Sequence, residues 1–329
     1  MKAARYYGIR DLRCEELPIP KIKENELLIK VAYAGICGSD LHIYNKQMFI
    51  QNIPETMGHE FVGRVEAVGS LVSDFSKGDA VIANPMVSCG HCPACQKKHF
   101  NCCENLGFIG EVRPGCFAEY IVLPEDALIS IPNGCDLRSF ALAEPLAVAL
   151  NVLERLSPAP DEKLAIIGAG PIGLLCILLA KKLYQVKDVS CIGRSAFRLN
   201  LASTLGAKTY DHFPDKSCFD AIIEAAGNQT CLDGAIAHSA VCGRIALVSV
   251  YEAEQLSLDF NLLVGSQITL IGCNCYDRHH LEDAVSYISH ADIDVAPLIS
   301  AEYDLSDCDQ AFRFINQKEK AAAKVLFKM

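Results

Sequence analysis

Hydrophobic and polar positions divide the chain into two stretches of different character. Up to about residue 125, short runs rich in β-branched residues alternate with turns that contain Gly, Pro and Asp, and this pattern predicts short β-strands. We expect strands within residues 26–36, 59–70 and 77–85, and two more within 115–132. Short strands with frequent turns favour a small β-barrel or β-sandwich.

The pattern changes near residue 137, where the apolar positions take a helical spacing. From Leu164 onwards strands and helices alternate. The predicted strands are 164–168, 188–193, 219–227, 244–250 and 267–272, and the predicted helices are 171–184, 195–205 and 229–240. This order is typical of an α/β protein with a doubly wound parallel sheet. The tail from about 274 returns to mixed elements and ends in KVLFKM, which we expect to be an edge or closing strand.

Composition and charge narrow the classes of partner. Of 329 residues, 51% are hydrophobic, and the formal net charge is -10, which argues against nucleic acid because phosphate backbones require a basic surface. No apolar run approaches the ~18 residues needed to span a membrane, and the first residues lack a secretory signal pattern. Seventeen cysteines are then better interpreted as thiols and metal ligands than as disulfides. We therefore expect a cytoplasmic protein without a membrane partner.

A glycine-rich turn connects the first predicted strand–helix pair. The segment IIGAGPIG places Gly168, Gly170 and Gly173 in the G-x-G-x-x-G pattern. These glycines permit a tight turn, the approach of a pyrophosphate and close packing of helix on strand. The helix start, with Pro171 and Ile172, offers unpaired N–H groups and the positive end of its dipole to phosphates. The pattern favours dinucleotide binding over a glycine-rich turn without a ligand.

Four cysteines are concentrated in the segment CGHCPACQKKHFNCC. Cys89, Cys92, Cys95 and Cys103 have the spacing C-x2-C-x2-C-x7-C, which suits a tetrahedral zinc. The surrounding loop is polar and has little material for a core, so a metal would supply much of its folding energy. An iron–sulfur cluster also accepts four thiolates, and the spacing does not choose between Cys103 and its neighbour Cys102.

Three further motifs, GICGSDLH (35–42), MGHE (57–60) and AEPLAVAL (143–150), carry a second set of possible ligands. Together with the glycine turn and the cysteine segment, in this order, they resemble the zinc-dependent medium-chain dehydrogenases, in the branch of the sorbitol, galactitol-phosphate and threonine dehydrogenases. The resemblance implies a GroES-like β-rich catalytic domain, residues 1–147 and 274–329, with a structural zinc lobe at about 86–104. It implies a Rossmann dinucleotide-binding domain at 148–273.

The resemblance assigns two zinc ions per chain, one catalytic and one structural. Cys37 and His59 match the family's first catalytic ligands, and Glu144 stands where the alcohol dehydrogenase branch has a second cysteine. The resemblance leaves three roles open for Glu60: it binds the zinc directly, it binds in exchange with another ligand, or it acts on the zinc only through a neighbouring ligand. The family also favours Cys103 over its neighbour for the structural zinc.

Other residues of these motifs match positions around the zinc. Asp40 matches the carboxylate that orients the ligand histidine, and Ser39 and His42 match a proton relay. Candidate residues for the wall of the substrate pocket are Tyr44, Phe49 and Phe117.

The resemblance also locates the residue that contacts the adenosine ribose. NAD-dependent members place an acid there, at the end of the second strand of the nucleotide domain. Counting back from the helix end Leu205–Ala207, this position is Gly193, within CIGRSAFR. Arg194, Ser195 and Arg198 can donate hydrogen bonds to a 2′-phosphate instead. We therefore predict NADP(H); the alternative is that these residues only solvate a helix start.

These observations predict an NADP(H)-dependent zinc oxidoreductase that passes a hydride between the cofactor and a secondary alcohol or ketone of polyol or sugar type. One alternative is a reductase of simple ketones or aldehydes, and another is a dehydrogenase of a phosphorylated polyol, with Arg113, Arg278 or His279 as phosphate ligands. A third is a non-catalytic, zinc- or redox-responsive NADPH-binding protein. The family also implies a homodimer or homotetramer.

Overall fold

The computed structural model describes residues 1–215, 217–253, 255–317 and 322–329. The chain forms two compact units. Of the described residues, unit 1 contains Met1–Glu144, 277–317 and Lys324–Met329, and unit 2 contains Pro145–Tyr276 and 322–323. The chain thus leaves unit 1 after its first half and returns to it. That the two units are domains with boundaries at 147 and 274 stays a prediction.

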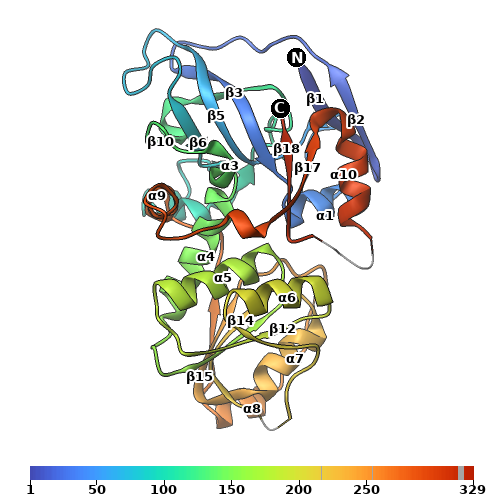
Figure 1. Ribbon diagram of the computed structural model, residues 1–329, viewed down its shortest axis with the longest axis vertical. Helices are drawn as coiled ribbons and strands as arrows, with labels where there is room; N and C mark the ends of the chain where they lie inside the picture. The colour runs from blue at the N-terminus through green and yellow to red at the C-terminus, as the bar shows by residue number, and fades with distance from the viewer. Residues whose placement is uncertain (216, 254, 318–321) are drawn as a thin grey trace. The chain divides into compact units, whose positions relative to one another are not determined.

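The main sheet of unit 1 combines the two ends of the chain. Its strand order is β10-β6-β5-β3-β18-β17, and β9 also pairs with β3 (Figure 1). The strands are β3 (Glu26–Gly35), β5 (Glu60–Val68), β6 (Ala80–Ala83), β9 (Tyr120–Pro124), β10 (Leu128–Ile131), β17 (Ile299–Asp304) and β18 (Lys324–Lys328). Because β18 is parallel to β17 and antiparallel to β3, KVLFKM is an interior, closing strand rather than an edge strand.

Smaller elements complete unit 1. A second sheet has the order β2-β1-β4, and β7 pairs with β8. The strands are β1 (Lys2–Gly8), β2 (Asp11–Glu16), β4 (Glu55–Thr56), β7 (Met86–Val87) and β8 (Gly107–Phe108). The helices are α1 (Gly38–Lys46), α2 (Pro93–Gln96), α3 (Leu137–Phe140), α9 (Arg278–Ser289) and α10 (Cys308–Ile315), with 3-10 turns η1 (Phe100–Cys102), η2 (Glu125–Ala127), η3 (Ala296–Leu298) and η4 (Leu305–Asp307). The prediction of a β-rich unit is therefore confirmed.

Unit 2 is a doubly wound parallel sheet with the order β13-β12-β11-β14-β15-β16. The strands are β11 (Lys163–Ile167), β12 (Asp188–Ile192), β13 (Lys208–Tyr210), β14 (Phe219–Glu224), β15 (Ser239–Leu247) and β16 (Thr269–Gly272). The helix α4 (Ala143–Leu156) enters the unit, and α5 (Pro171–Lys182), α6 (Ala196–Thr204), α7 (Gln229–Ala237) and α8 (Phe260–Gly265) follow the strands. Figure 1 shows α5 and α6 on one face of the sheet, with α7 and α8 on the other. The predicted Rossmann topology is confirmed.

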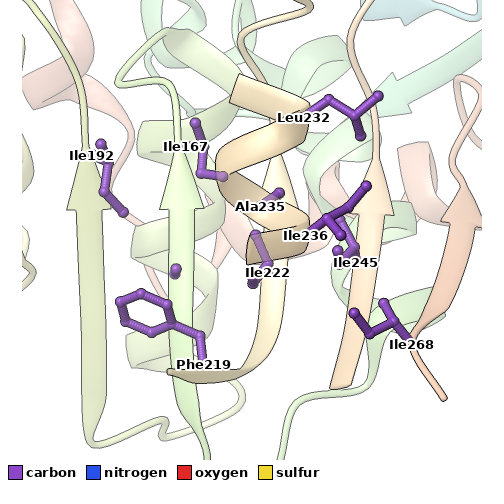
Figure 2. Close-up of a cluster of buried hydrophobic side chains, with 10 residues drawn as sticks. Ile167, Ile192, Phe219, Ile222, Leu232, Ala235, Ile236, Ile245 and Ile268 are labelled. Carbon is purple, nitrogen blue, oxygen red and sulfur yellow. The ribbon is translucent and has the colours of Figure 1, made fainter. Parts of the chain in front are cut away.

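The core of unit 2 fixes the strands that carry the glycine turn. Leu232, Ala235 and Ile236 lie at positions i, i+3 and i+4 of α7, and this face packs on Ile222 and Ile245 of the sheet (Figure 2). The rest of the cluster is Ala165, Ile167, Ile192, Phe219 and Ile268. Each large side chain buried here stabilises the fold by about 1.5–3 kcal/mol. The ends of β11 and β12 are therefore held rigidly.

Within the described ranges, the helices are too short or too polar to cross a lipid bilayer.

Candidate metal and dinucleotide sites

The start of helix α1 holds the first group of predicted site residues. Cys37 is the N-cap residue, and its backbone N–H donates to Asp40 Oδ2 at 2.8 Å, which closes a capping box. The positive end of the helix dipole therefore lies at Cys37. Ser39 Oγ is buried, and no hydrogen-bond partner is found for it among the described residues. His42 lies on the same helix, with its ring edge-on to Phe49 at 6.3 Å.

His59 precedes β5 and is 5% exposed. Its Nδ1 lies 3.9 Å from Asp40 Oδ1, so Nε2 is left for a ligand on the other side of the ring. Burial opposes protonation of His59, but contact with Cys37 and the charges of Cys37, Asp40 and Glu144 together raise its pKa. Burial also raises the pKa of Asp40 to about 6. The structure thus brings Cys37, Asp40 and His59 into one electrostatically coupled site.

Two glutamates complete the predicted catalytic set. Glu60 is 1% exposed at the start of β5, and one of its oxygens lies within 4.8 Å of the ligand atoms of Cys37 and His59. Glu144, 8% exposed in the first turn of α4, acts electrostatically on His59. Glu144 does not belong to the group of ligand atoms, from Cys37, His59 and Glu60, that all lie within 4.8 Å of one another.

This arrangement fits a divalent cation. A thiol, an imidazole and a carboxylate converge, and these are ligands that zinc accepts. In addition, the buried Ser39 Oγ has no hydrogen-bond partner among the described residues, and the buried Asp40 Oδ1 has none there beyond the 3.9 Å ion-pair contact with His59 Nδ1. Buried polar atoms are normally paired, so unpaired atoms beside a convergent ligand set are consistent with a site that is completed by a bound group. The assignment of the individual ligands stays a prediction.

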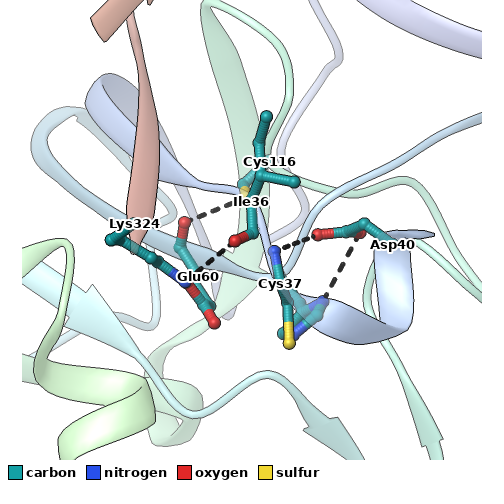
Figure 3. A network of polar contacts seen from close by, with 7 residues as sticks. Ile36, Cys37, Asp40, Glu60, Cys116 and Lys324 are labelled. Carbon is teal, nitrogen blue, oxygen red and sulfur yellow. Dashed lines mark hydrogen bonds and ion pairs between the residues drawn. The ribbon is translucent and has the colours of Figure 1, made fainter. Parts of the chain in front are cut away.

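Three residues near this site were not predicted from the sequence. Lys324 is 1% exposed, and its ammonium contacts Glu60 and the Ile36 carbonyl (Figure 3). Phe108 lies with its ring centroid 5.8 Å from that of His59. Glu111, in the turn after Phe108, is 8% exposed, and burial raises its pKa to about 7.

Two predicted wall residues belong to the core instead. Phe117 is 0% exposed and packs against Phe312 and Phe327. Tyr44 is 2% exposed, and its hydroxyl donates to Asp309 at 2.9 Å. Aromatic side chains on an apolar face are more often core than pocket wall, and here the core interpretation is correct for both.

The cysteine lobe has the geometry of a four-thiolate site. Cys89, Cys92, Cys95 and Cys103 place their sulfurs within 4.8 Å of one another, and the pairs Cys89–Cys95 and Cys92–Cys103 are 4.0 Å apart. A tetrahedral zinc with Zn–S bonds of 2.3 Å requires about 3.8 Å between sulfurs. Backbone N–H groups lower the pKa of Cys92 to about 6, which favours thiolate there, whereas burial raises the pKa of Cys95 to about 12. Cys102 is exposed and outside the cluster.

The predicted glycine turn lies between β11 and α5, next to the neighbouring strand β14. Gly168 has φ +105°, and a Cβ there would approach the Ala225 carbonyl oxygen to 2.6 Å. A Cβ on Gly173 would lie 2.0 Å from the Gly168 oxygen, so helix and strand could not pack as they do. Gly170, the N-cap of α5 before Pro171, faces open space. These are the properties that a pyrophosphate-binding turn needs.

The segment CIGRSAFR begins with the last two residues of β12 and continues into α6 beside this turn. Gly193 N donates to the Tyr210 carbonyl at 3.0 Å, and Gly168 N donates to the carbonyl of Ile192, the residue before Gly193. Ser195 is the N-cap of α6 and Arg194 is exposed. Arg198 Nε donates to the Ala322 carbonyl at 2.7 Å, so part of its guanidinium is already engaged. Arg194 and Ser195 are thus the more accessible of the predicted phosphate ligands.

Comparison with known proteins agrees with this geometry. Residues 23–133 match the model of the alcohol dehydrogenase GroES-like domain, and residues 142–325 match that of the glucose dehydrogenase C-terminus. The sorbitol dehydrogenase of Bacillus subtilis (strain 168) is 29% identical over 99% of this chain and 96% of its own. The structure of galactitol-1-phosphate dehydrogenase from Escherichia coli is 30% identical, with a TM-score of 0.92 over 100% of both chains.

Two further solved structures differ in their cofactor. A zinc-binding dehydrogenase from Sinorhizobium meliloti 1021 is bound to NADP, with a TM-score of 0.93 and 28% identity over 100% of this chain and 99% of its own. An alcohol dehydrogenase from Escherichia coli CFT073 is complexed with NADH, with a TM-score of 0.92 and 29% identity over the same shares. These relatives are named as dehydrogenases, two of them of polyol-type substrates, and two of the solved structures hold NADP or NADH. The chain therefore belongs to the zinc-dependent medium-chain dehydrogenase/reductase family, with its polyol dehydrogenase-like members, and is an oxidoreductase of this kind.

Proposed function

We propose that this protein interconverts a secondary alcohol of polyol or sugar type with its ketone, with NADP(H) as cofactor. A catalytic zinc would be held by Cys37, His59, Glu60 and Glu144. The observation that carries the proposal is the convergence of Cys37, His59 and Glu60 within 4.8 Å of one another. Zinc bound there would supply a Lewis acid that polarises an alcohol or carbonyl oxygen.

The chain's own residues have separate tasks at this site. Asp40 faces His59 Nδ1 and fixes the ring so that Nε2 is presented as the ligand atom. Ser39 has a buried hydroxyl, without a hydrogen-bond partner in the described part of the chain, that can accept and pass on the substrate's proton. His42 would continue this relay from the same helix. The cysteine lobe would hold the second, structural zinc through Cys89, Cys92, Cys95 and Cys103, a number of thiolates typical of closed structural sites.

NADP(H) is favoured over NAD(H) by the chemistry of CIGRSAFR. No carboxylate is present in this segment at the end of β12, where an acid would bind the ribose hydroxyls and repel a 2′-phosphate. Arg194 is exposed and Ser195 offers a hydroxyl and the start of α6. Both groups suit a phosphate dianion.

A neutral polyol is favoured over a phosphorylated one. Asp40, Glu111 and Glu144 all act electrostatically on His59, so the site is acidic before any metal binds. Arg278, one suggested phosphate ligand, already donates to Glu282 and to the carbonyls of Asp126 and Leu128. The similarity to galactitol-1-phosphate dehydrogenase keeps the phosphorylated class as a second candidate.

The test is a panel of polyols, sugars, polyol phosphates and simple ketones assayed with NADPH/NADP⁺ and with NADH/NAD⁺. We expect the highest kcat/KM for a polyol with the phosphorylated cofactor. Metal analysis should give about two zinc ions per chain, with about one lost in Cys37→Ser. A protein that oxidises no alcohol, or that keeps all its zinc in Cys37→Ser, would contradict the proposed catalytic site, and a clear preference for NADH would contradict the cofactor assignment.

We also propose that the protein is a homodimer or homotetramer. Unit 2 exposes Val241, Phe260 and Val264 to 73%, 66% and 72%, and such apolar side chains are enriched in interfaces. Light scattering after size-exclusion chromatography would measure the assembly directly, and a monomer at micromolar concentration would refute it.

A further inference from the structure

A buried lysine at the candidate metal site has no part in the chemistry described so far. Lys324, the first residue of β18, is 1% exposed, and lysine is almost never buried to this extent without a partner. Its ammonium donates to the Ile36 carbonyl at 3.0 Å and forms an ion pair with Glu60 Oε2 (Figure 3). Glu60 is also 1% exposed. A fully buried ion pair therefore lies directly beside two candidate zinc ligands.

The pairing of three strands brings these two charges together. In the sheet, Gly35 of β3 is opposite Glu60 of β5 on one side and opposite Leu326 of β18 on the other. Lys324 lies two residues before Leu326, so its side chain is on the same face of the sheet. Glu60 and Lys324 reach each other over Gly35, where a Cβ would lie 2.4 Å from Glu60 Oε2 and 2.8 Å from Lys324 Cε. The strand between them has no side chain at the point where they meet.

The backbone of Glu60 is fixed from another direction as well. The buried Cys116 thiol contacts the Glu60 carbonyl at 3.6 Å, and Cys116 N donates to the Gly58 carbonyl at 2.9 Å. The main chain of Glu60 is thus held by β3 and by Cys116, and its buried side chain is held at Oε2 by Lys324.

A carboxylate can offer a metal one oxygen or two. Because Oε2 is engaged by Lys324, Oε1 is the Glu60 oxygen outside the ion pair and the one better able to bind a cation between Cys37 and His59. A single oxygen on a carboxylate that is already neutralised is a weaker ligand than a free, bidentate carboxylate. It also leaves room at the metal for a substrate oxygen, which a catalytic zinc requires.

We propose that Lys324 is a positioning residue that restricts Glu60 to one-oxygen contact with the metal and so keeps a coordination position open. This rests on the proposed catalytic zinc, and it adds a residue that sets the strength of one ligand. Lys324 touches neither substrate nor cofactor in this proposal and acts through Glu60 alone.

The experiment compares Lys324→Met, Glu60→Gln and the double variant with the wild type, all loaded with zinc. Release of zinc to a chromophoric chelator is followed, and the fraction that is absent in Cys37→Ser identifies the catalytic site. We expect Lys324→Met to release this zinc about tenfold more slowly, within the usual range for two coupled residues. In the Glu60→Gln background, Lys324→Met should have no such effect.

Cobalt substitution gives a second readout that needs no substrate or cofactor. If Lys324→Met lets both Glu60 oxygens bind, the d–d absorption of Co²⁺ at the site should weaken, because higher coordination numbers give weaker bands. Turnover should fall through kcat rather than KM as the open position is lost. Lys328→Met is the matched control, since it removes the same charge from an exposed position of the same strand, and we expect it to resemble the wild type.

Several outcomes would overturn the proposal. Equal slowing of zinc release in the wild-type and Glu60→Gln backgrounds would mean that Lys324 acts only by charge repulsion on the metal. Faster release in Lys324→Met, with an unfolding midpoint like that of the wild type, would also contradict it. If Lys324→Met does not fold, the comparison of Lys324→Arg with the wild type decides. Arginine keeps a cation beside Glu60, so zinc release and kcat should both stay close to the wild-type values, and a tenfold change in either would contradict the proposal. A different result is that the protein oxidises none of the alcohols in the panel and still shows slower zinc release in Lys324→Met that depends on Glu60. That result would refute the proposed function and leave this inference standing.

Discussion

Replacement of Gly193 by aspartate tests the cofactor assignment most directly. Gly193 lies at the end of β12 beside the glycine turn, where an acid would face the adenosine ribose. Its backbone is not left-handed, and a Cβ would lie 3.2 Å from Ala169 Cβ and 3.3 Å from Leu199 Cδ2. Leu199 is only partly buried, so its side chain can move by the few tenths of an ångström that are needed.

The magnitude follows from two electrostatic changes of opposite effect. A carboxylate next to a 2′-phosphate dianion costs about 2–3 kcal/mol, so kcat/KM with NADPH should fall roughly 30- to 150-fold. With NADH the same carboxylate accepts from ribose hydroxyls, and such bonds contribute about 1.5–3 kcal/mol, or roughly a tenfold to 150-fold gain. The ratio of the two kcat/KM values should therefore change by roughly 300- to 20,000-fold.

The assay is steady-state kinetics with both cofactors at one fixed, saturating concentration of the best alcohol or ketone from the panel. Gly193→Ala is the control, since it adds the Cβ without the charge and should lower both kcat/KM values by a similar small factor. A Gly193→Asp variant that loses activity equally with both cofactors would show that Gly193 does not face the ribose. The reasoning from CIGRSAFR to NADP(H) would then be wrong.

Two further predictions concern stability. Cys95→Ser should lose about one zinc ion per chain and lower the unfolding temperature, because the buried cluster of the lobe consists only of cysteines with Ala94 and Leu106. The control Cys102→Ser should change neither zinc content nor unfolding temperature. Metal analysis and calorimetry measure both quantities, and full zinc content in Cys95→Ser would refute the prediction. The Arg244 guanidinium beside Glu162 lowers the pKa of that carboxyl, so this stabilisation is present above the ordinary pKa of about 4.3 and is lost as the pH falls through the lower, folded value. Glu162→Gln should cost about 1 kcal/mol at pH 7 and almost nothing near pH 3, measured by urea unfolding at both pH values; an equal loss at both would contradict the ion pair.

The parts of this protein that depend on contiguous residues could be predicted from the sequence. The glycine turn is a local device: Gly168 and Gly173 are needed because of backbone atoms only a few residues away. The four cysteines of the lobe lie within fifteen residues, so their spacing alone limits how far apart the sulfurs can be. The alternation of strands and helices in unit 2 is equally local, and the predicted strand positions there agree with the structure to within a few residues.

The candidate catalytic set was predictable only through the order of its motifs. Cys37, His59 and Glu144 each have an ordinary structural explanation, and their spacing in the sequence does not predict that they lie close together in the fold. Strands β1 and β2 were missed for a related reason. The segment MKAARYYGIRDLRCEE is too charged for a clear apolar alternation, yet Ala3, Ala4 and Tyr6 are fully buried because the main chain pairs β1 with β2 and β4.

Lys324 shows most clearly what a sequence pattern cannot reveal. In KVLFKM it marks the polar end of an apolar strand, and an exposed lysine is the ordinary interpretation of such a position. Its burial depends on β18 pairing with both β3 and β17, and its partner Glu60 is 264 positions away along the chain. The meeting also requires Gly35, whose missing side chain leaves the space for both charges. Three residues that are unremarkable in their own segments therefore determine together how one carboxylate faces the metal site. None of the three residues indicates this contact by itself. The contact can be recognised from the register of the strands but not from a sequence motif.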